Sequence, residues 1–251
     1  DINDAHIVNT LDETLNDKSE FKQLFALDLL WTLPLEPWKH TIRTLFSTGS
    51  LAVKRGVLEL AWRQPDILPD QLIIENIHSN DELTPFTISC AGDRCIYKQV
   101  EILPQYLEST SNAIRSSSAV AILKQEPEDK EARAALDLIL DEGSENNIVE
   151  TLGFMKGLIG FMSQNQFLRF LSHKSDNIKN VSLSLIEKNP DNSYLNAVIQ
   201  SLAKASTFRQ AEKALLSFPE KISLVQLDFR LNDPTSSTEL RAGILKIFHH
   251  Y

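Results

Sequence analysis

The chain has 251 residues and a formal net charge of −9, and 42% of its residues are hydrophobic. This hydrophobic fraction suffices for a continuous core and excludes disorder of the whole chain. No run approaches the roughly 18 uninterrupted apolar residues of a membrane helix, and the first residues are acidic, unlike the basic and apolar start of a secretion signal. We therefore expect a soluble cytoplasmic protein that does not insert into a membrane through this segment.

Near the start of successive amphipathic helices, an apolar residue is followed by a basic one. The pairs are Phe21-Lys22, Val53-Lys54, Ile114-Arg115, Ile178-Lys179, Phe208-Arg209 and Leu240-Arg241. Their basic residues are 32, 61, 64, 30 and 32 positions apart, so one period fits all of them if the long gaps hold two repeats. A period of roughly 31 residues is typical of stacked helical hairpins, none of which buries its apolar face alone.

The helix that carries the basic residue is the second of each predicted hairpin, and it begins with a serine suited to cap free backbone N–H groups. These serines are Ser19, Ser50, Ser111, Ser175, Ser206 and Ser237. The period also predicts two second helices without the basic residue. One starts at Thr84-Pro85-Phe86-Thr87, and the other carries the apolar series Ile148, Leu152, Met155, Leu158 and Ile159.

First helices are expected between these second helices, with short loops marked by proline and glycine. Their predicted ranges are 5–15, 38–46, 69–78, 97–107, 128–141, 164–172, 193–204 and 220–231. The best strand candidate, Leu72-Ile73-Ile74, falls where a first helix is expected. We predict an all-α chain of about eight helical hairpins that forms a single domain over residues 1–251, as part of a longer polypeptide.

Two segments, Ser50–Leu58 and Ser175–Leu183, resemble the second helix of HEAT repeats, with a turn residue, a valine-like residue, a basic residue and then small and apolar residues. The resemblance extends over the whole chain through its period. It implies a right-handed α–α superhelix of HEAT-like or armadillo-like units.

A narrower resemblance covers about residues 128–188. An acidic helix ending at Leu136–Leu140 is followed by Leu152–Leu158, by Phe167–Leu171 and by a HEAT-like second helix. This succession is similar to the soluble HEAT region attached to bacterial membrane carriers of the ATP/ADP translocase type. The resemblance implies a cytoplasmic domain beside a carrier domain, at the cytoplasmic face of a membrane.

Acidic residues are concentrated in one window of the sequence, residues 126–150. The candidate protein-binding residues there are Glu126, Glu128, Asp129, Glu131, Asp137, Asp141, Glu142 and Glu145. This density predicts a docking surface for a basic partner. The alternative is that these residues are the solvated faces of two helices and their loop.

The basic residues of the repeat admit two interpretations. They could line one surface and bind an acidic partner, or each could bond to carbonyls or to an acidic residue of a neighbouring repeat. Because the two copies around Thr87 and residue 149 lack the charge, we interpret the series mainly as a mark of repeat architecture.

Tryptophan and cysteine positions give further expectations. Trp31 and Trp62 end successive second helices about one period apart, so we expect equivalent positions in the core or at its edge, with an interface role as the alternative. Cys90 and Cys95 fit neither a zinc pattern nor a disulfide framework. We expect both to be buried, reduced thiols.

Catalytic signatures are missing from the sequence. There is no phosphate-cradling glycine-rich loop, no HExxH spacing and no nucleophile motif. We therefore expect no enzyme activity, no cofactor and no metal site, and instead a scaffold module that binds a partner protein or an adjoining domain of its own polypeptide. One alternative is a helical-repeat DNA glycosylase that uses Asp28 and Trp31. The acidic net charge disfavours this alternative, and we expect no nucleic-acid partner. Another alternative is a structural spacer without a ligand.

Overall fold

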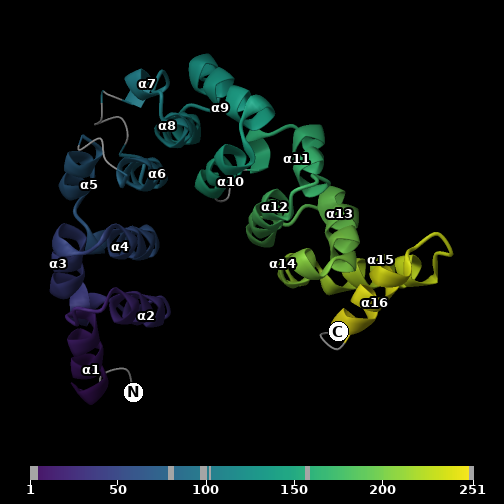
Figure 1. The fold of residues 1–251 in the computed structure, drawn as a ribbon, viewed down its shortest axis with the longest axis horizontal. Helices are drawn as coiled ribbons and strands as arrows, with labels where there is room; N and C mark the ends of the chain where they lie inside the picture. The colour runs from purple at the N-terminus through teal and green to yellow at the C-terminus, as the bar shows by residue number, and fades with distance from the viewer. Residues whose placement is uncertain (1–4, 79–81, 97–100, 102, 156–158, 249–251) are drawn as a thin grey trace. The chain divides into compact units, whose positions relative to one another are not determined.

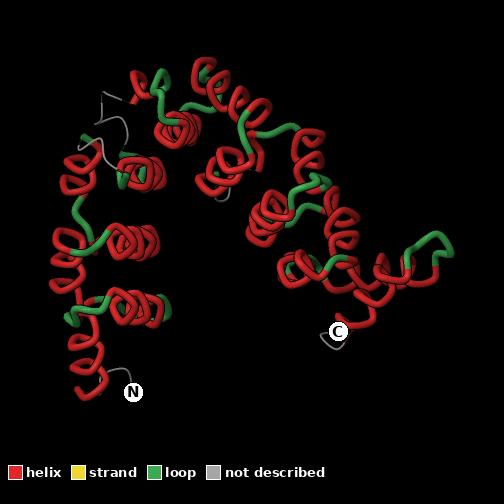
Figure 2. The backbone as a smooth tube through the Cα atoms, in the orientation of Figure 1, coloured by secondary structure: helices red, strands yellow, loops and turns green. Residues whose placement is uncertain are grey.

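The computed structural model describes residues 5–78, 82–96, 101, 103–155 and 159–248. These residues form sixteen α-helices and several short 3-10 helices joined by loops, and they contain no strand (Figure 2). The all-α prediction is therefore confirmed. The helices divide into two compact units, residues 1–137 and residues 138–251. The expectation of a single domain stays a prediction.

The first unit is built from hairpins whose first and second helices form two rows (Figure 1). Its helices are α1 Ala5–Leu15, α2 Glu20–Leu30, α3 Lys39–Thr48, α4 Leu51–Arg63, α5 Asp70–Ile77, α6 Thr84–Asp93, α7 Leu103–Tyr106 and α8 Asn112–Gln125. Helices α2, α4, α6 and α8 pack against one another in succession. The next helix, α9 (Lys130–Glu142), continues past the division between the units.

The second unit repeats this pattern with a second set of hairpins. Its helices are α10 Glu145–Phe154, α11 Gln164–Leu171, α12 Asp176–Lys188, α13 Leu195–Gln200, α14 Ala205–Leu216, α15 Glu220–Asn232 and α16 Thr238–Ile247. Helix α12 packs between α10 and α14, while α13 contacts both α11 and α15. Stacked helical hairpins are thus present within each unit.

The predicted second helices correspond to the even-numbered helices from α2 to α16. The two second helices that were predicted without a basic residue are α6 and α10. Helix α10 is shorter than expected, because it ends at Phe154 and Ile159 begins a separate 3-10 turn; Leu158 lies outside the described residues. Of the predicted first helix 97–107, residues 97–100 and 102 are also outside the description, and α7 is its helical part.

Serine caps fix where most second helices begin. Ser19, Ser50, Ser111, Ser175 and Ser237 are N-cap residues as predicted, and the last four accept a hydrogen bond from a backbone N–H of the first turn. Ser206 is not a cap, because α14 starts earlier, after Lys204. The structure adds two caps that the period analysis missed, Ser144 for α10 and Ser163 for α11.

These caps reveal that two of the six apolar-basic pairs are out of register. Val53 is the third residue of α4 and is fully buried, as Ile178 is in α12. Phe21 is only the second residue of α2, and it is 78% exposed. In α14 the third residue is Thr207, which is buried. Phe208 is the fourth residue, one position later in its helix than Val53 is in α4. Lys22 and Arg209 are therefore not structural equivalents of Lys54 and Lys179.

The tryptophans occupy two kinds of environment. Trp38 is fully buried, and its Nε1 donates a hydrogen bond to the Val8 carbonyl at 3.1 Å. Trp31 and Trp62 are each 39% exposed, so neither lies inside the core. Trp31 is the C-cap of α2 and Trp62 lies within α4, and the equivalence of their positions stays a prediction.

The two cysteines also differ, and the expectation for one of them is wrong. Cys90 is buried in α6, and burial raises the pKa of its thiol to about 11. Cys95 is exposed and has a φ of 59°. Because it lies beyond the end of α6, in a turn, the hydrophobic pattern of the helix does not extend to it.

Candidate functional site

Five of the eight acidic residues that were predicted to bind a protein belong to the first unit. Glu126 is the C-cap of α8, Glu128 is exposed in the following turn, and Glu131 is exposed in the first turn of α9. Asp129 has a structural task, because its Oδ1 accepts a hydrogen bond from the Ala132 N–H at 2.8 Å. Asp137 is half-buried within α9.

The other three acidic residues belong to the second unit, and two of them contact neighbouring hairpins. Asp141 Oδ1 accepts hydrogen bonds from Arg169 Nη2 at 2.5 Å and Gln166 Nε2 at 3.3 Å. Glu145 contacts Asn177 of α12. Glu142 is exposed at the end of α9, where a carboxylate meets the negative end of the helix dipole.

Helical spacing places several of these groups on one side of α9. Glu131 and Glu142 are eleven residues apart, which is close to three helical turns. Leu138 lies on the same side and is 49% exposed. We call Glu131, Leu138 and Glu142 the α9 face: an apolar side chain flanked by two carboxylates, with no hydrogen bond or ion pair from either carboxylate to a described residue.

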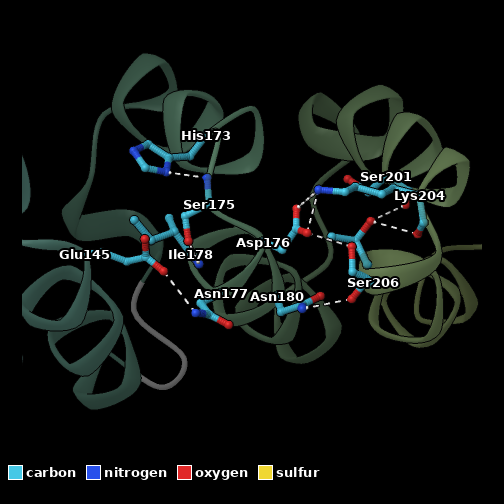
Figure 3. Close-up of polar contacts among 11 residues, drawn as sticks. Glu145, His173, Ser175, Asp176, Asn177, Ile178, Asn180, Ser201, Lys204 and Ser206 are labelled. Atoms are coloured by element: carbon cyan, nitrogen blue, oxygen red, sulfur yellow. Dashed lines mark hydrogen bonds and ion pairs between the residues drawn. The ribbon is translucent and has the colours of Figure 1, made fainter.

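Figure 3 shows a polar cluster at the N-terminal ends of the second helices in the second unit. Glu145, in the first turn of α10, accepts a hydrogen bond from Asn177 Nδ2 at 2.9 Å. Hydrogen bonds from the Ser175 hydroxyl and from Asn177 hold the pKa of Glu145 below its ordinary value. Ser175 is also the N-cap of α12, and its Oγ accepts from the Ile178 N–H. The cluster thus joins α10 to α12.

One repeat further along the chain, a similar set of bonds joins α12 to α14 (Figure 3). Asp176 forms an ion pair with Lys204 at 2.5 Å and accepts a hydrogen bond from the Ser206 hydroxyl at 2.7 Å. The hydrogen bonds from Lys204 and Ser206 lower the pKa of Asp176. Asn180 Nδ2 donates to the Ser206 carbonyl at 3.1 Å. These bonds fix how successive hairpins stack.

The cluster brings a serine, a histidine and a glutamate together, but its geometry is not that of an activated nucleophile. His173 Nδ1 accepts a hydrogen bond from the backbone N–H of Ser175 at 3.1 Å, not from its hydroxyl. The Ser175 hydroxyl is directed to Glu145 and its oxygen caps α12. A general base must reach the proton that it removes, and Nδ1 of His173 does not. The arrangement is a set of hydrogen bonds that joins α10 to α12.

Sequence reasoning missed these contacts although the chain contained a signal for them. Glu145 and Asn177 are 32 residues apart, and Asp176 and Lys204 are 28 apart. Both separations lie near the repeat period, so polar residues one period apart at a helix start are candidates for contact. Composition alone does not distinguish them from other exposed polar pairs.

Three of the six basic residues of the repeat have local partners instead of contacts between repeats. Lys22 Nζ lies 2.7 Å from Asp17, and Arg115 contacts Asn112 and the Ser109 carbonyl. Arg241 Nη2 donates to the Asp233 carbonyl at 2.7 Å. The bonds to Asp17, Ser109 and Asp233 join each basic residue to the segment before its own helix, and Asn112 is the first residue of α8 itself. The interpretation that these groups tie neighbouring repeats together is therefore wrong for these three residues.

Other candidate chemistry is not assembled in the described part of the chain. No group of three or more histidine, cysteine, aspartate or glutamate side chains is placed to hold a metal ion there. In those residues no helix combines the length and apolar character that crossing a membrane requires. A cavity of about 590 Å³, open to solvent, lies between two turns of the second unit and is lined by Pro190, Asp191, Asn192, Ser217, Phe218 and Pro219.

No protein-family model and no curated protein sequence matches the chain. Neither membership of the HEAT family nor the link to translocase-type carriers is therefore confirmed. The chain is similar to the solved structure of human deoxyhypusine hydroxylase in complex with glycerol, with 14% identity over 98% of this chain and 97% of that chain and a TM-score of 0.44.

That hydroxylase is, by its name, an enzyme, and our expectation that this chain is not an enzyme is corrected accordingly. The expectation depended on missing motifs and on the repeat architecture. Catalytic residues that are gathered from several repeats leave no local motif in a sequence, so neither observation excludes catalysis. The activity of the hydroxylase is not transferred to this chain.

Proposed function

We propose that this chain is a protein-interaction module that binds a basic segment of a partner protein, or of an adjoining domain of its own polypeptide, along helix α9. The observation that carries the proposal is the α9 face, in which an exposed leucine lies between two exposed carboxylates. Stacked helical hairpins provide extended surfaces of this kind.

The proposal assigns different tasks to the acidic residues. Asp129, Asp141 and Glu145 cap a helix or join hairpins, so they support the fold around the surface. Glu131 and Glu142 make no such bond to a described residue, and their charge is available to a partner. Glu142 also lies where the helix dipole disfavours it, so it does not serve to stabilise α9.

The chemistry of the surface suggests the character of the partner. In a suitable partner helix, lysine or arginine side chains flank an apolar stripe. The basic side chains would then meet Glu131 and Glu142, and the apolar stripe would meet Leu138. Long-range attraction between such a segment and the acidic residues would speed association at low salt. The cytoplasmic location and the association with a membrane carrier remain predictions.

The test measures binding of a fluorescent synthetic helical peptide composed of lysine and leucine. The double variant Glu131→Lys/Glu142→Lys reverses two charges on α9 without removing a cap or an interhelical bond. We expect its affinity at low salt to fall at least tenfold, because each lost attraction becomes a repulsion and exposed pairs contribute up to about 1 kcal/mol each.

The matched control is Glu59→Lys/Glu239→Lys, which changes the net charge equally at exposed positions on α4 and α16. Circular dichroism of both variants verifies that the helices remain folded. If the two double variants bind the peptide equally well, attraction to the net charge explains binding and the proposal is wrong. Loss of binding on changing Leu138→Ser alone would add support for the apolar contact.

A further inference from the structure

Helix α15 exposes a stripe of apolar side chains along one side. Ile222, Val225 and Phe229 are 37%, 66% and 60% exposed, whereas Ser223 and Leu227 on the other side of the helix are fully buried. The three exposed residues are spaced by three and four positions. Side chains at this spacing align on one side of a helix and form the seam between two paired helices. The described residues leave this side of α15 largely uncovered.

Two opposite charges accompany this stripe. Lys221 and Asp228 are both exposed, and neither forms an ion pair with another described residue. They are seven residues apart, which is nearly two full helical turns, so they lie along the same edge of the stripe. Asp228 accepts a hydrogen bond from Asn232 Nδ2 at 3.0 Å, one turn further along α15. A positive charge thus lies near one end of the stripe and a negative charge near the other.

We propose that a second copy of this chain docks on α15, with the two α15 helices packed antiparallel about a two-fold axis. Ile222 of one copy then lies opposite Phe229 of the other, and the two Val225 side chains meet near the axis. A two-fold axis places the same edge of both stripes together, so Lys221 of each copy faces Asp228 of the other, offset by only about 3 Å along the helix axis. The surface is therefore self-complementary, as the interface of a symmetric dimer must be.

The exposed apolar stripe of α2 lacks this self-complementarity. Phe21, Phe25 and Leu29 are 78%, 53% and 42% exposed, but Lys22 and Asp28 lie on opposite edges of their stripe, because six residues turn a helix through about 600°. Antiparallel pairing of two α2 helices would therefore place lysine on the side of lysine and aspartate on the side of aspartate. This repulsion favours α15 as the surface for self-association. The proposal does not depend on binding of a partner to α9.

The experiment is sedimentation equilibrium of the full chain at low salt, from about 1 μM to about 1 mM. Because three apolar side chains from each copy make a small contact, we expect a weak equilibrium between monomer and dimer. Phe229→Ser removes an apolar contact twice in a symmetric pair, so it should raise the dimer dissociation constant at least about tenfold. The matched control is Phe25→Ser on α2, which removes a phenylalanine that is 53% exposed and should leave the constant unchanged.

A charge exchange tests the antiparallel arrangement itself. Lys221→Glu alone and Asp228→Lys alone each turn two attractions into repulsions, so each should weaken the dimer about tenfold. An equimolar mixture of the two variants should associate as strongly as the wild type, because every charge again meets its opposite. Circular dichroism verifies that all variants are folded. The proposal is overturned if the wild type stays monomeric over the whole range, if the mixture associates no better than either variant alone, or if Phe25→Ser weakens the dimer as much as Phe229→Ser.

Discussion

The two units differ in the exposure of the charged side chains that join successive hairpins. In the first unit, these side chains are largely buried: Lys124 of α8 pairs with Asp93 of α6, and arginines reach backbone carbonyls. Arg94 is the main example: its side chain is only 6% exposed, and its guanidinium donates to the Leu68 carbonyl at 2.7 Å and to the Ala61 carbonyl at 3.0 Å. Arg43 of α3 donates to the Ile67 carbonyl at 2.7 Å, in the turn that follows α4.

In the second unit, the ion pairs between hairpins include side chains that are half exposed or more. Asp176 pairs with Lys204, whose side chain is 58% exposed. Asp141 pairs with Arg169, and both side chains are about half exposed. Water competes for such groups, and salt screens them. We infer that the first unit depends on its interhelical polar bonds for stability, whereas those of the second unit mainly set the register of the stack.

The largest expected effect comes from Arg94→Met. The substitution leaves two carbonyls of the neighbouring hairpin without their donor, and buried unsatisfied groups are costly, so we expect a loss of about 3 kcal/mol in the free energy of unfolding. Trp31, Trp38 and Trp62 all lie in the first unit. Tryptophan fluorescence during denaturation by urea therefore reports on this unit.

Arg169→Met in the second unit is the matched control. Because Arg169 is 51% exposed and its ion pair is solvated, its removal should lower stability by at most about 1 kcal/mol. Circular dichroism follows this loss, since the second unit contains no tryptophan. Equal losses for the two variants would contradict the difference that we infer.

A smaller effect is expected from close packing at a glycine of the first unit. A Cβ added at Gly92 in α6 would lie 2.8 Å from both Cα and Cβ of Ala121 in α8. Because the backbone of α8 must shift, Gly92→Ala should destabilise the first unit by about 1–3 kcal/mol, again measured by fluorescence.

Gly153 in α10 provides the comparison in the second unit. An added Cβ there meets no described atom within 4 Å. Gly153→Ala should therefore raise stability by about 0.5 kcal/mol, because alanine loses less backbone entropy in a helix than glycine does. A destabilising Gly153→Ala would show that α10 is packed more tightly than the structure indicates.

The smallest effect is expected from acid and salt on the exposed bonds of the second unit. The pKa values of Asp176 and Glu145 are both lowered in the folded state, so their contribution is present above the ordinary carboxylate pKa and is lost as pH falls through the lowered values. Asp176→Asn should reduce this acid sensitivity. The measurement is amide hydrogen exchange at the starts of α12 and α14, at low and at high salt. Exchange rates that do not change with salt would argue against a solvated ion pair between Asp176 and Lys204.

The sequence predicted the fold class well because its signals are local. Capping by Ser50, Ser111 and Ser175 and the helical spacing that follows each cap are properties of short segments. The site was less predictable. Glu131 and Asp141 look alike in the sequence, yet Asp141 binds Arg169 of another hairpin and Glu131 does not.

By itself, the sequence determined the period, the all-helical architecture and most helix starts. Only the tertiary structure decided which side of each helix is covered. Phe21 and Val53 both precede a lysine near a helix start, but Phe21 is 78% exposed and Val53 is fully buried. The reason is that a one-residue change relative to the cap turns a side chain by about 100° around the helix axis. Burial then depends on whether a neighbouring hairpin lies on that side.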